Sequence, residues 1–430
     1  MKKRRMIVLS LDGVGSRDLP FLETLPVFSD FLREAAGCRQ VTSVYPSLTY
    51  PAHTTIVTGR LPAQHGIINN LKLQPEREPS DWFWQRKYIK GTTLYDEAAK
   101  RGWKTAAFLW PVTGGAKIRW NMPEVLPNRL WQNQVMVSAI NGSPLFQLDL
   151  LKRFGHLRDG IRQPQLDDFV FESVLYTLEK HRPELILVHL TDADSQRHIY
   201  GVESHQAEEA LVRHGNRLNR LLNTLDRLGL KEETDLVILG DHYQKDVKTA
   251  LYPNYYLVKK GFIEIRKGKV KQWKILARDC DGSCYIYVKD PCFLPASKAL
   301  FGRLAEREGS GIERIYSREE AEQLGADPQC ALMLEAKKGY YFQNGWQKYQ
   351  VEKGASDHHR GVVIQAATHG YYPYEKGYET FFMASGPDFK PGVRAEKMTL
   401  ADEGPTLAAA LGFSLGRTDG KTMRDLLRLG

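Results

Sequence analysis

The sequence predicts an α/β fold built on a mostly parallel central sheet flanked by helices. Apolar runs of strand length alternate along the chain with amphipathic stretches of helical period, which is typical of parallel sheets with helical crossovers. Polar residues directly follow several of these strands, at the edge where open α/β sheets gather their functional groups. Between residues 250 and 355 the pattern changes to alternating and aromatic runs, which indicate a smaller α+β insertion.

The predicted core elements follow one another in a regular order. The expected strands cover residues 5–11, 39–44, 105–110, 184–190, 234–239 and 380–385. The expected helices cover residues 21–36, 93–101, 166–180, 206–228 and a closing helix from residue 406. Residues 111–165 are rich in Pro, Gly and Asn, which indicates loops and short helices over one face.

The domain organisation expected from this pattern is a core in two parts, interrupted by a cap. The core comprises residues 1–249 and 356–430, and the cap comprises residues 250–355. Within the cap, residues 295–308 predict a helix that has a proline in its first turn, where proline is tolerated. Residues 255–258 indicate β structure, and residues 339–351 resemble a hairpin.

The composition is that of an ordinary globular protein. The 430 residues are 42% hydrophobic and 26% charged. No apolar run approaches the roughly 18 residues of a membrane span. The basic start MKKRRMIVLSLDGVG is a poor signal peptide, because Asp12 interrupts a short apolar run and no cleavage site follows. We therefore expect a cytoplasmic protein with no membrane segment.

The net charge and the cysteines indicate which kind of partner and which kind of scaffold to expect. The net charge of +9 favours anionic substrates such as phosphate esters, although it also fits a role in solubility alone. No basic motif interleaved with aromatic residues indicates a nucleic-acid-binding module. The five cysteines are an odd number, which argues against a disulfide scaffold. The expected partner is a small molecule, and the sequence leaves the oligomeric state open.

Residues 44–70, VYPSLTYPAHTTIVTGRLPAQHGIINN, contain the first candidate for chemistry. Pro51 keeps Tyr50 out of the α region and suits a first helical turn. Thr49 is therefore expected near a helix N-terminus, where backbone N–H groups favour an anion. A hydroxyl at that position suits attack on a phosphorus or sulfur ester, and an ordinary helix cap is the alternative for this motif alone.

Metal-type ligands follow four separate strand or loop ends. They are Asp12, Asp194 with His198, Asp241 with His242, and His369. Carboxylate oxygen together with imidazole nitrogen suits Zn²⁺ or a similar cation. Asp194 and His198 are spaced i, i+4, which puts both on one face of a helix. Each residue alone also fits a turn, a cap or a core histidine, but the set together with one hydroxyl matches a two-metal site.

The motifs as a set resemble the alkaline phosphatase superfamily, most closely its nucleotide pyrophosphatase/phosphodiesterase branch. The segments that carry the resemblance are LDG at 11–13, PSLTYPAHTTIVTGRLPAQHGIINN at 46–70, DADSQRHIYG at 192–201, GDH at 240–242 and THG at 368–370. The resemblance covers about residues 6–415 in order. It implies an alkaline-phosphatase-like fold and hydrolysis of phosphate esters.

The resemblance also implies a role for each site residue. Thr49 would be the nucleophile that becomes transiently phosphorylated, and Asn70 would hydrogen-bond a non-bridging phosphoryl oxygen. Tyr50 would pack on the substrate. Two Zn²⁺ ions are implied, with Mn²⁺ or another divalent metal as the alternative. One ion would be held by Asp194, His198 and His369, and the other by Asp12, Asp241 and His242 with Thr49 bridging toward it.

Three features depart from the family pattern. Tyr243 and Gln244 follow the Asp-His pair where the family usually has Gly. His189 stands where many members carry an aromatic residue. These departures concern the expected nucleobase pocket rather than the metal ligands. Asp357, His358 and His359 also form a cluster outside the family motifs, and we interpret them as loop residues.

The leading hypothesis is a zinc-dependent hydrolase that cleaves phosphodiester or nucleotide pyrophosphate bonds through a phospho-threonine intermediate. A phosphonate or phosphomonoester hydrolase of the same superfamily is the alternative. Tyr50 and the region around Trp82 favour a diester, because a second ester group needs apolar contact. A non-catalytic binding protein is a third hypothesis, although a pure binder has no need of a nucleophile. A sulfatase is disfavoured because Thr49 is not in a C/S-x-P-x-R setting.

Overall fold

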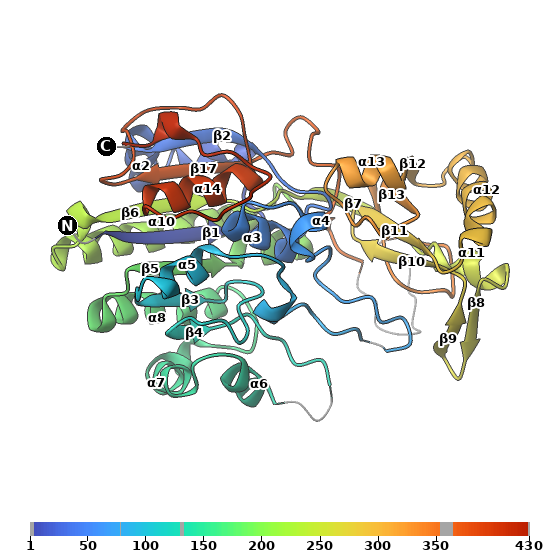
Figure 1. Ribbon diagram of the computed structural model, residues 1–430, viewed down its shortest axis with the longest axis horizontal. Helices are drawn as coiled ribbons and strands as arrows, with labels where there is room; N and C mark the ends of the chain where they lie inside the picture. Colours follow the sequence, from blue (N-terminus) through green and yellow to red (C-terminus); the bar gives the residue numbers. More distant parts are fainter. Residues whose placement is uncertain (1–3, 78, 130–132, 353–363, 429–430) are drawn as a thin grey trace.

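An eight-stranded sheet forms the centre of the computed structural model, which describes residues 4–77, 79–129, 133–352 and 364–428. Its strand order is β18-β2-β17-β6-β1-β5-β3-β4 (Figure 1). The strands are β1 (Arg5–Leu11), β2 (Ala36–Thr42), β3 (Thr105–Phe108), β4 (Trp120–Met122), β5 (Leu185–Leu190), β6 (Thr234–Leu239), β17 (Thr380–Ser385) and β18 (Met398–Thr399). All neighbours pair in parallel except β17, which pairs antiparallel with β2 and β6. The predicted mostly parallel sheet is confirmed.

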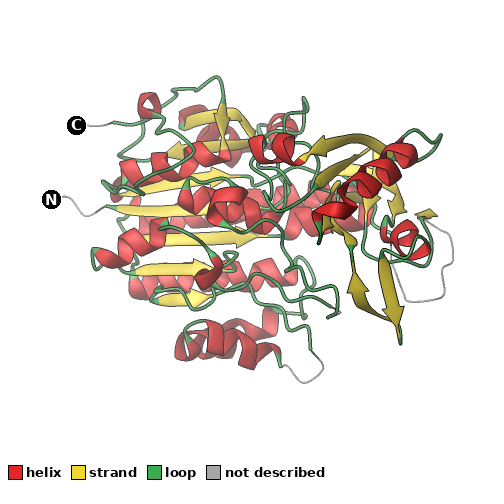
Figure 2. Cartoon of the chain, turned by 45° about the vertical axis from the view of Figure 1, so that its right-hand side comes forward, coloured by secondary structure: helices red, strands yellow, loops and turns green. Residues whose placement is uncertain are grey.

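Helices cover both faces of this sheet (Figure 2). Side chains alternate between the faces of a strand, so Ile7 and Leu9 join one hydrophobic cluster while Met6 and Val8 join the other. The first face packs against α1 (Leu19–Leu22), α2 (Pro26–Glu34), α8 (Gln165–His181) and α10 (His205–Arg227). The second face packs against α3 (Thr49–Thr58), α5 (Leu94–Lys100) and α14 (Leu400–Ala410). The result is a three-layer α/β/α core.

The parallel strands all end at the same edge of the sheet. β1 lies between β5 and β6, so the residues that follow these three strands emerge side by side. In Figure 1 this edge faces the smaller sheets, whereas both chain ends lie at the opposite end of the strands. The short helices α4 (Pro62–His65) and α9 (Asp192–Tyr200) lie near this edge, in segments that follow α3 and β5.

Residues after β6 build the smaller sheets. One contains β10 (Ile275–Cys280), β11 (Ser283–Val288), β13 (Leu332–Ala336) and β12 (Ile312–Ser317). Another has β7 (Lys245–Leu251) between β14 (Gly339–Phe342) and β15 (Gln350–Glu352), and β7 also pairs with β16 (Ala367–Thr368). β8 (Ile263–Arg266) and β9 (Lys269–Trp273) form a hairpin, and the helices are α11 (Asn254–Lys259), α12 (Leu294–Ala305) and α13 (Arg318–Gln323).

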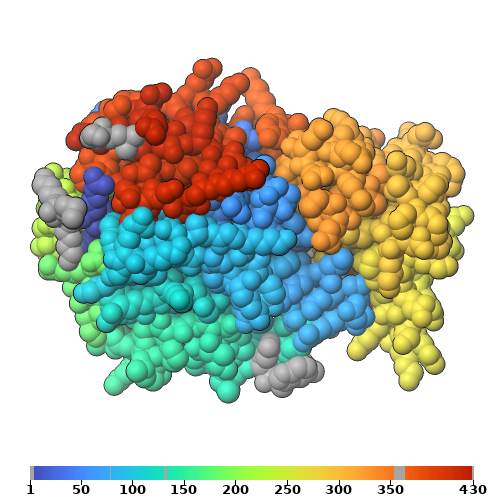
Figure 3. Space-filling view, in the orientation of Figure 1, coloured from blue at the N-terminus to red at the C-terminus, as the bar shows by residue number. Residues whose placement is uncertain are grey.

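These smaller sheets pack directly on the core. In Figure 3 the yellow and orange surface of this part lies against the blue segment of the core around residues 60–90. Asn69 donates a hydrogen bond to the carbonyl of Asp279 at 2.8 Å, and the Ala63 N–H donates to the carbonyl of Gly325 at 2.9 Å. The cap boundaries at residues 250 and 355 stay a prediction, and residue 355 lies outside the described part of the chain.

Three local predictions were wrong. The helix expected over residues 21–36 is broken, because Pro26 starts α2 and Leu25 before it is extended, with φ −87° and ψ 117°. The hairpin expected at 339–351 does not form, since β14 and β15 each pair with β7 instead of with each other. Residues 255–258 lie in helix α11 and not in a strand. Their aromatic side chains pack on neighbouring elements from this helix.

Residues 111–165 contain more regular structure than their composition indicated. β4 extends the sheet by one edge strand, and α6 (Gln134–Asn141) and α7 (Pro144–Phe154) lie together beyond it (Figure 1). Asn133 caps α6 by accepting from the N–H of Val135 at 2.9 Å. Within the described residues, no helix combines the length and the apolar character that a membrane crossing requires.

A buried ion pair fixes α9 to the end of β1. Arg197 donates to both carboxylate oxygens of Asp18, from Nη2 at 2.6 Å and from Nη1 at 3.1 Å, and also contacts the Gly13 carbonyl. Both side chains are buried. Since this pair holds the loop after β1 against α9, it determines how those two segments meet at the sheet edge.

We predict that Arg197→Met lowers the free energy of unfolding by about 3–5 kcal/mol, because it leaves Asp18 buried without its cationic partner. The matched control is Arg33→Met, which removes an ion pair with Asp30 in which both side chains are 67% exposed and should cost less than about 1 kcal/mol. Urea unfolding of the two variants measures the difference. Equal losses in both variants would contradict a structural role for the buried pair.

Candidate active site

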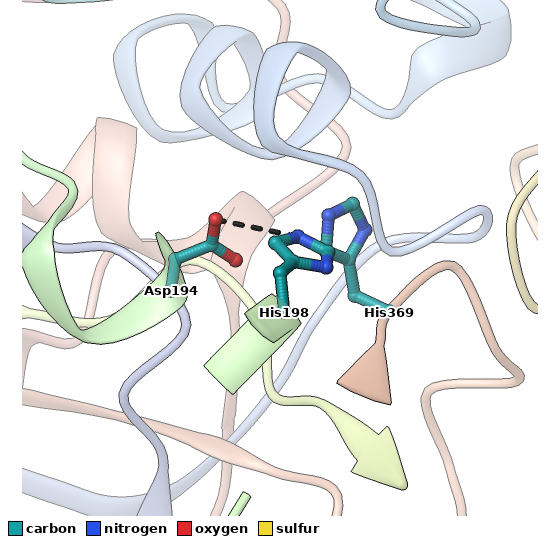
Figure 4. A group of neighbouring side chains, drawn as sticks. All are labelled: Asp194, His198 and His369. Carbon is teal, nitrogen blue, oxygen red and sulfur yellow. Dashed lines mark ion pairs between the residues drawn. The ribbon is translucent and has the colours of Figure 1, made fainter. Parts of the chain in front are cut away.

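The first group of predicted ligands meets beside α9. Asp194 and His198 extend from one face of this helix toward His369, which follows β16 (Figure 4). His198 Nε2 lies 3.4 Å from Asp194 Oδ2, and one ligand atom of each of the three residues lies within 4.8 Å of the others. His198 Nδ1 is held at 2.9 Å by the carbonyl of Ala367, which leaves Nε2 for a metal.

The second group forms where β1 and β6 end. Ligand atoms of Asp12, Asp194 and His242 lie within 4.8 Å of one another. Asp241 Oδ2 is 3.2 Å from His242 Nε2, while Asp241 Oδ1 accepts from the N–H of Gly13 at 3.1 Å. Asp194 thus belongs to both groups. All six predicted ligands converge, and their division between two ions stays a prediction.

Gly13 explains the LDG motif after β1. Its φ of +70° is a left-handed conformation that favours glycine, and an added Cβ would lie 3.1 Å from the Asp194 Cα and Cβ atoms. The turn at Gly13 therefore lets the end of β1 approach α9 closely. This approach brings Asp12 and Asp194, which are far apart in the sequence, into one site.

Thr49 is the first residue of α3 and lies beside the second group. Its Oγ1 is 3.1 Å from His242 Nε2, and the residue is 8% exposed. The backbone N–H of Tyr50 donates to Asn70 Oδ1 at 2.9 Å. Because this hydrogen bond uses the oxygen of the Asn70 amide, the N–H₂ group is left as a donor for the cavity that Asn70 lines.

Burial and neighbouring charges shift the pKa values of the three carboxylates of the site. Burial and the nearby charge of Asp194 raise the pKa of Asp12 to about 7. Burial and the charge of Asp12 raise the pKa of Asp241 well above its usual value. Burial also acts on Asp194, but the charge and hydrogen bond of His198 outweigh it and lower the Asp194 pKa. A cluster of this kind disfavours further negative charge and favours a cation.

Several candidate ligand atoms have no hydrogen-bond partner within the described residues. They include Asp12 Oδ1, Asp241 Oδ2 and His369 Nδ1, all buried. A buried polar atom without a hydrogen bond is costly, and the combination of carboxylate oxygen with imidazole nitrogen is the donor set of a zinc-type cation. The residues present therefore fit a metal centre.

Sequence reasoning missed that two of the departures from the family pattern support ligands. His189 Nε2 lies 2.9 Å from Asp12 Oδ2, and Gln244 donates to Asp194 Oδ1. His189 lies in β5 and pairs with Ser10 of β1, which comes two residues before Asp12. This register of the sheet is the signal that would have placed His189 beside Asp12. The third departure, Tyr243, packs its ring 5.0 Å from the Arg197 guanidinium. All three lie at or behind the metal ligands.

The segment expected to be a cap reaches the site at one point. Asp281, in the turn between β10 and β11, lies with Oδ2 4.0 Å from His369 Nδ1. Among the described residues that line the active-site cavity, none belongs to 250–355. We expect this segment to shape substrate choice rather than chemistry, and this expectation stays a prediction. Asp357, His358 and His359 lie outside the described residues.

A cavity of about 480 Å³ opens from the ligand cluster. Its lining includes Asp12, Thr49, Tyr50, Asn70, Asp194, His198 and His369. The Tyr50 ring is buried in a cluster with Ile67, Ile89 and Val112, and its centroid lies 5.3 Å from that of Trp82. The cavity then continues between β4, α6, α7 and the start of α8.

We predict that the ligand groups can be emptied separately. His369→Ala should lose one bound metal and keep the other, whereas Asp12→Ala should lose the other, because each variant removes a ligand found in one group only. His205→Ala, whose side chain is 78% exposed, is the control and should keep both. Elemental analysis of the purified variants gives the metal content per chain. Two bound metals in either site variant would refute the assignment.

Comparisons with known proteins agree with this geometry. The sequence profile of the family described as type I phosphodiesterase / nucleotide pyrophosphatase matches residues 6–372. Human ectonucleotide pyrophosphatase/phosphodiesterase family member 1 is 27% identical over 265 residues, which cover 58% of this chain and 25% of the human protein. Rat family member 3 is 24% identical over 412 residues, which cover 90% of this chain and 39% of the rat protein. The chain thus spans well under half of the length of these relatives.

Solved structures show the same fold. Murine ectonucleotide pyrophosphatase/phosphodiesterase 5 superimposes with a TM-score of 0.69 and 19% identity, covering 99% of this chain and 100% of the murine chain. An inactive threonine-to-alanine variant of the murine protein, in complex with AMP, gives the same TM-score at 20% identity. At this identity the likeness establishes the fold alone, which confirms the alkaline-phosphatase-like α/β architecture.

Proposed function

The chain belongs to the type I phosphodiesterase / nucleotide pyrophosphatase family, and from this premise we propose that it hydrolyses phosphodiester or nucleotide pyrophosphate bonds at Thr49. The observation that carries the proposal is the meeting of a helix-terminal hydroxyl with six metal-type ligands, with Thr49 Oγ1 3.1 Å from His242 Nε2. The AMP complex of the murine relative supports a substrate with a nucleoside monophosphate part.

The proposed cofactors are two Zn²⁺ ions, with Mn²⁺ or another divalent metal as the alternative. Asp194, His198 and His369 would hold one ion, and Asp12, Asp241 and His242 would hold the other, beside Thr49. When bound, the ions neutralise charge on the phosphoryl oxygens and lower the pKa of the Thr49 hydroxyl. The unpartnered buried ligand atoms of both groups support this assignment.

Thr49 and Asn70 are the two side chains that act directly on the phosphate in this proposal. Thr49 Oγ1 gives up its proton to solvent and forms a bond to phosphorus, while the bond from phosphorus to the leaving oxygen breaks and one alcohol or phosphate product departs, protonated from solvent. Water then cleaves the bond between Thr49 and phosphorus, which releases the phosphomonoester and restores the hydroxyl. The Asn70 N–H₂ group donates to a non-bridging oxygen as charge develops there, and its contact with the Tyr50 N–H keeps the amide in this orientation.

The alternative phosphonate or phosphomonoester activity has less support. A monoester carries more negative charge and needs additional cationic groups around the phosphate. Arg158 is the one lysine or arginine among the described residues that line the cavity, and its Nε already donates to the Gly160 carbonyl at 2.7 Å. Trp82, which is partly exposed at the cavity, offers apolar contact that suits the second ester group of a diester.

The cysteines support the proposal of a cytoplasmic location. All five are free, and Cys38, Cys280, Cys284 and Cys330 are buried as thiols. A chain of this size without disulfides is typical of a reducing compartment. Fractionation of the producing cells tests the location directly.

Thr49→Ala should keep both metals and the fold but lose at least about 10³-fold in turnover of bis-p-nitrophenyl phosphate, because it removes the attacking atom. Thr49→Ser should retain part of the activity, since it keeps the oxygen and loses only the methyl that restricts its rotamer. Mass spectrometry after an acid quench should find a p-nitrophenyl phosphoryl group on Thr49. Near wild-type hydrolysis by Thr49→Ala would show that another nucleophile attacks phosphorus.

Asn70 offers a test that separates its two roles. Asn70→Asp keeps the oxygen that accepts from the Tyr50 N–H but removes the donor, whereas Asn70→Ala removes both. We predict that both variants lower kcat by about 10²–10³-fold, the usual effect of losing one oxyanion donor. Steady-state kinetics with the same diester measures this. If Asn70→Asp retained wild-type kcat, Asn70 would act only by holding the start of α3.

A further inference from the structure

The turn between β10 and β11 packs directly on the segment that carries His369. The backbone N–H of Gly282 donates to the His369 carbonyl at 2.8 Å. Ser283, the first residue of β11, is fully buried, and its Oγ donates to the Gly370 carbonyl at 2.7 Å. Two consecutive carbonyls at His369 are therefore held by the smaller sheets and not by the core.

Gly370 makes this close approach possible. Its φ is +83°, and an added Cβ would lie 1.9 Å from the carbonyl oxygen of Cys280, so any side chain here would force the turn away from His369. The N–H of Gly370 donates at 3.0 Å to the carbonyl of Ser47, two residues before Thr49. The segment of His369 thus lies between the turn and the segment that leads to the proposed nucleophile.

Glu335 of β13 fixes the same two segments with one buried carboxylate. Its Oε2 accepts from the Tyr45 hydroxyl at 2.7 Å, and its Oε1 accepts from the N–H of Tyr372 at 2.9 Å. Tyr45 precedes Thr49 in the chain, and Tyr372 follows His369. Because β13 pairs with β11, the sheet that carries the turn is anchored on both sides of the site.

Asp281 is the charged residue of this turn, and it faces His369. Its Oδ2 lies 4.0 Å from His369 Nδ1, which is buried and has no hydrogen-bond partner among the described residues. A metal-bound histidine usually donates its second ring N–H to a carboxylate or a carbonyl. His198 already has such a partner in the Ala367 carbonyl, and Asp281 is placed to serve His369 in the same way.

We propose that the β10–β11 turn is an outer part of the metal site, with Asp281 as the positioning residue of His369. Asp281 accepts a hydrogen bond from His369 Nδ1 and so leaves Nε2 to the metal. The observed separation is about 1 Å longer than such a bond, which a rotation of the partly exposed Asp281 side chain closes. The inference rests on the proposed function, because it concerns the metal of that site. It departs from the expectation that residues 250–355 shape substrate choice rather than chemistry.

Equilibrium competition for zinc between the loaded, intact protein and a chromophoric chelator tests this without any substrate. Asp281→Gly should weaken one of the two zinc sites by about 10–100-fold, the usual effect of losing the outer partner of a metal-bound histidine, and leave the other site unchanged. Asp281→Asn keeps an acceptor oxygen and should give an intermediate affinity. Both residues suit the left-handed backbone of this position, where φ is +57°.

Lys267→Gly is the matched control for Asp281→Gly. Lys267 lies in the turn between β8 and β9 and has a similar φ of +52°, so the change to glycine has the same backbone effect in another hairpin of the same part of the chain. It should leave both zinc affinities unchanged. Equal zinc affinities of the wild type and Asp281→Gly, or equal losses in Asp281→Gly and Lys267→Gly, would overturn the role of Asp281.

A pair of serine variants tests the backbone support. Ser283→Ala removes the hydroxyl that holds the Gly370 carbonyl, whereas Ser297→Ala removes a fully buried hydroxyl of α12 that has no hydrogen-bond partner among the described residues. Ser283→Ala should weaken the same zinc site by about 2–10-fold, the usual worth of one hydrogen bond, and Ser297→Ala should not. Equal zinc affinities of the two variants would contradict support through Ser283.

Zinc binding and turnover separate this inference from the proposed function. If Asp281→Gly weakens one zinc site but the wild type hydrolyses no diester, the proposed function is wrong and the positioning role stands. If diesters are hydrolysed and Asp281→Gly binds zinc as the wild type does, the function stands and the positioning role is wrong. A wild-type protein that binds no zinc would overturn the positioning role.

Discussion

The arrangement of the active site follows from three carboxylates that are buried together. Asp12, Asp194 and Asp241 emerge at one edge of the sheet, and burial with mutual repulsion raises the pKa of two of them. Each carboxylate accepts a hydrogen bond from one supporting donor. The donors are His189, Gln244 and the backbone N–H of Gly13. Because these donors leave oxygen atoms directed at His242 and one another, the cluster is most stable with cations between its members.

The sequence was sufficient to predict the core and to place the candidate ligands together at one edge of the sheet, for physical reasons. Buried parallel strands are short apolar runs, and the residues after them must share one edge of the sheet. Asp194 and His198 could be placed on one helical face by their spacing alone. Prediction failed at residues 339–351, where pairing partners are chosen by tertiary contacts with β7 rather than by a local turn.

The surroundings of the ligands required coordinates. His189 supports Asp12 only because β5 pairs with β1 in one particular register, which no local pattern in either strand specifies. The cavity was hidden for a different reason. Its walls come from β4, α6, α7 and α8, and residues 111–165 looked irregular because of their Pro, Gly and Asn content. Residue spacing predicts which side chains share a face within one element, but it does not predict which elements pack together.

The place of β17 has a consequence for how the protein is made. This strand lies between β2 and β6, although about 340 residues of chain separate it from β2. During synthesis, β2 and β6 therefore leave the ribosome with the edges that will later receive β17 still unpaired. His369 also arrives late, shortly before β17. Closure of the sheet and completion of the candidate ligand set thus both wait for residues 369–385, and until these are made the nascent chain carries open strand edges that favour association.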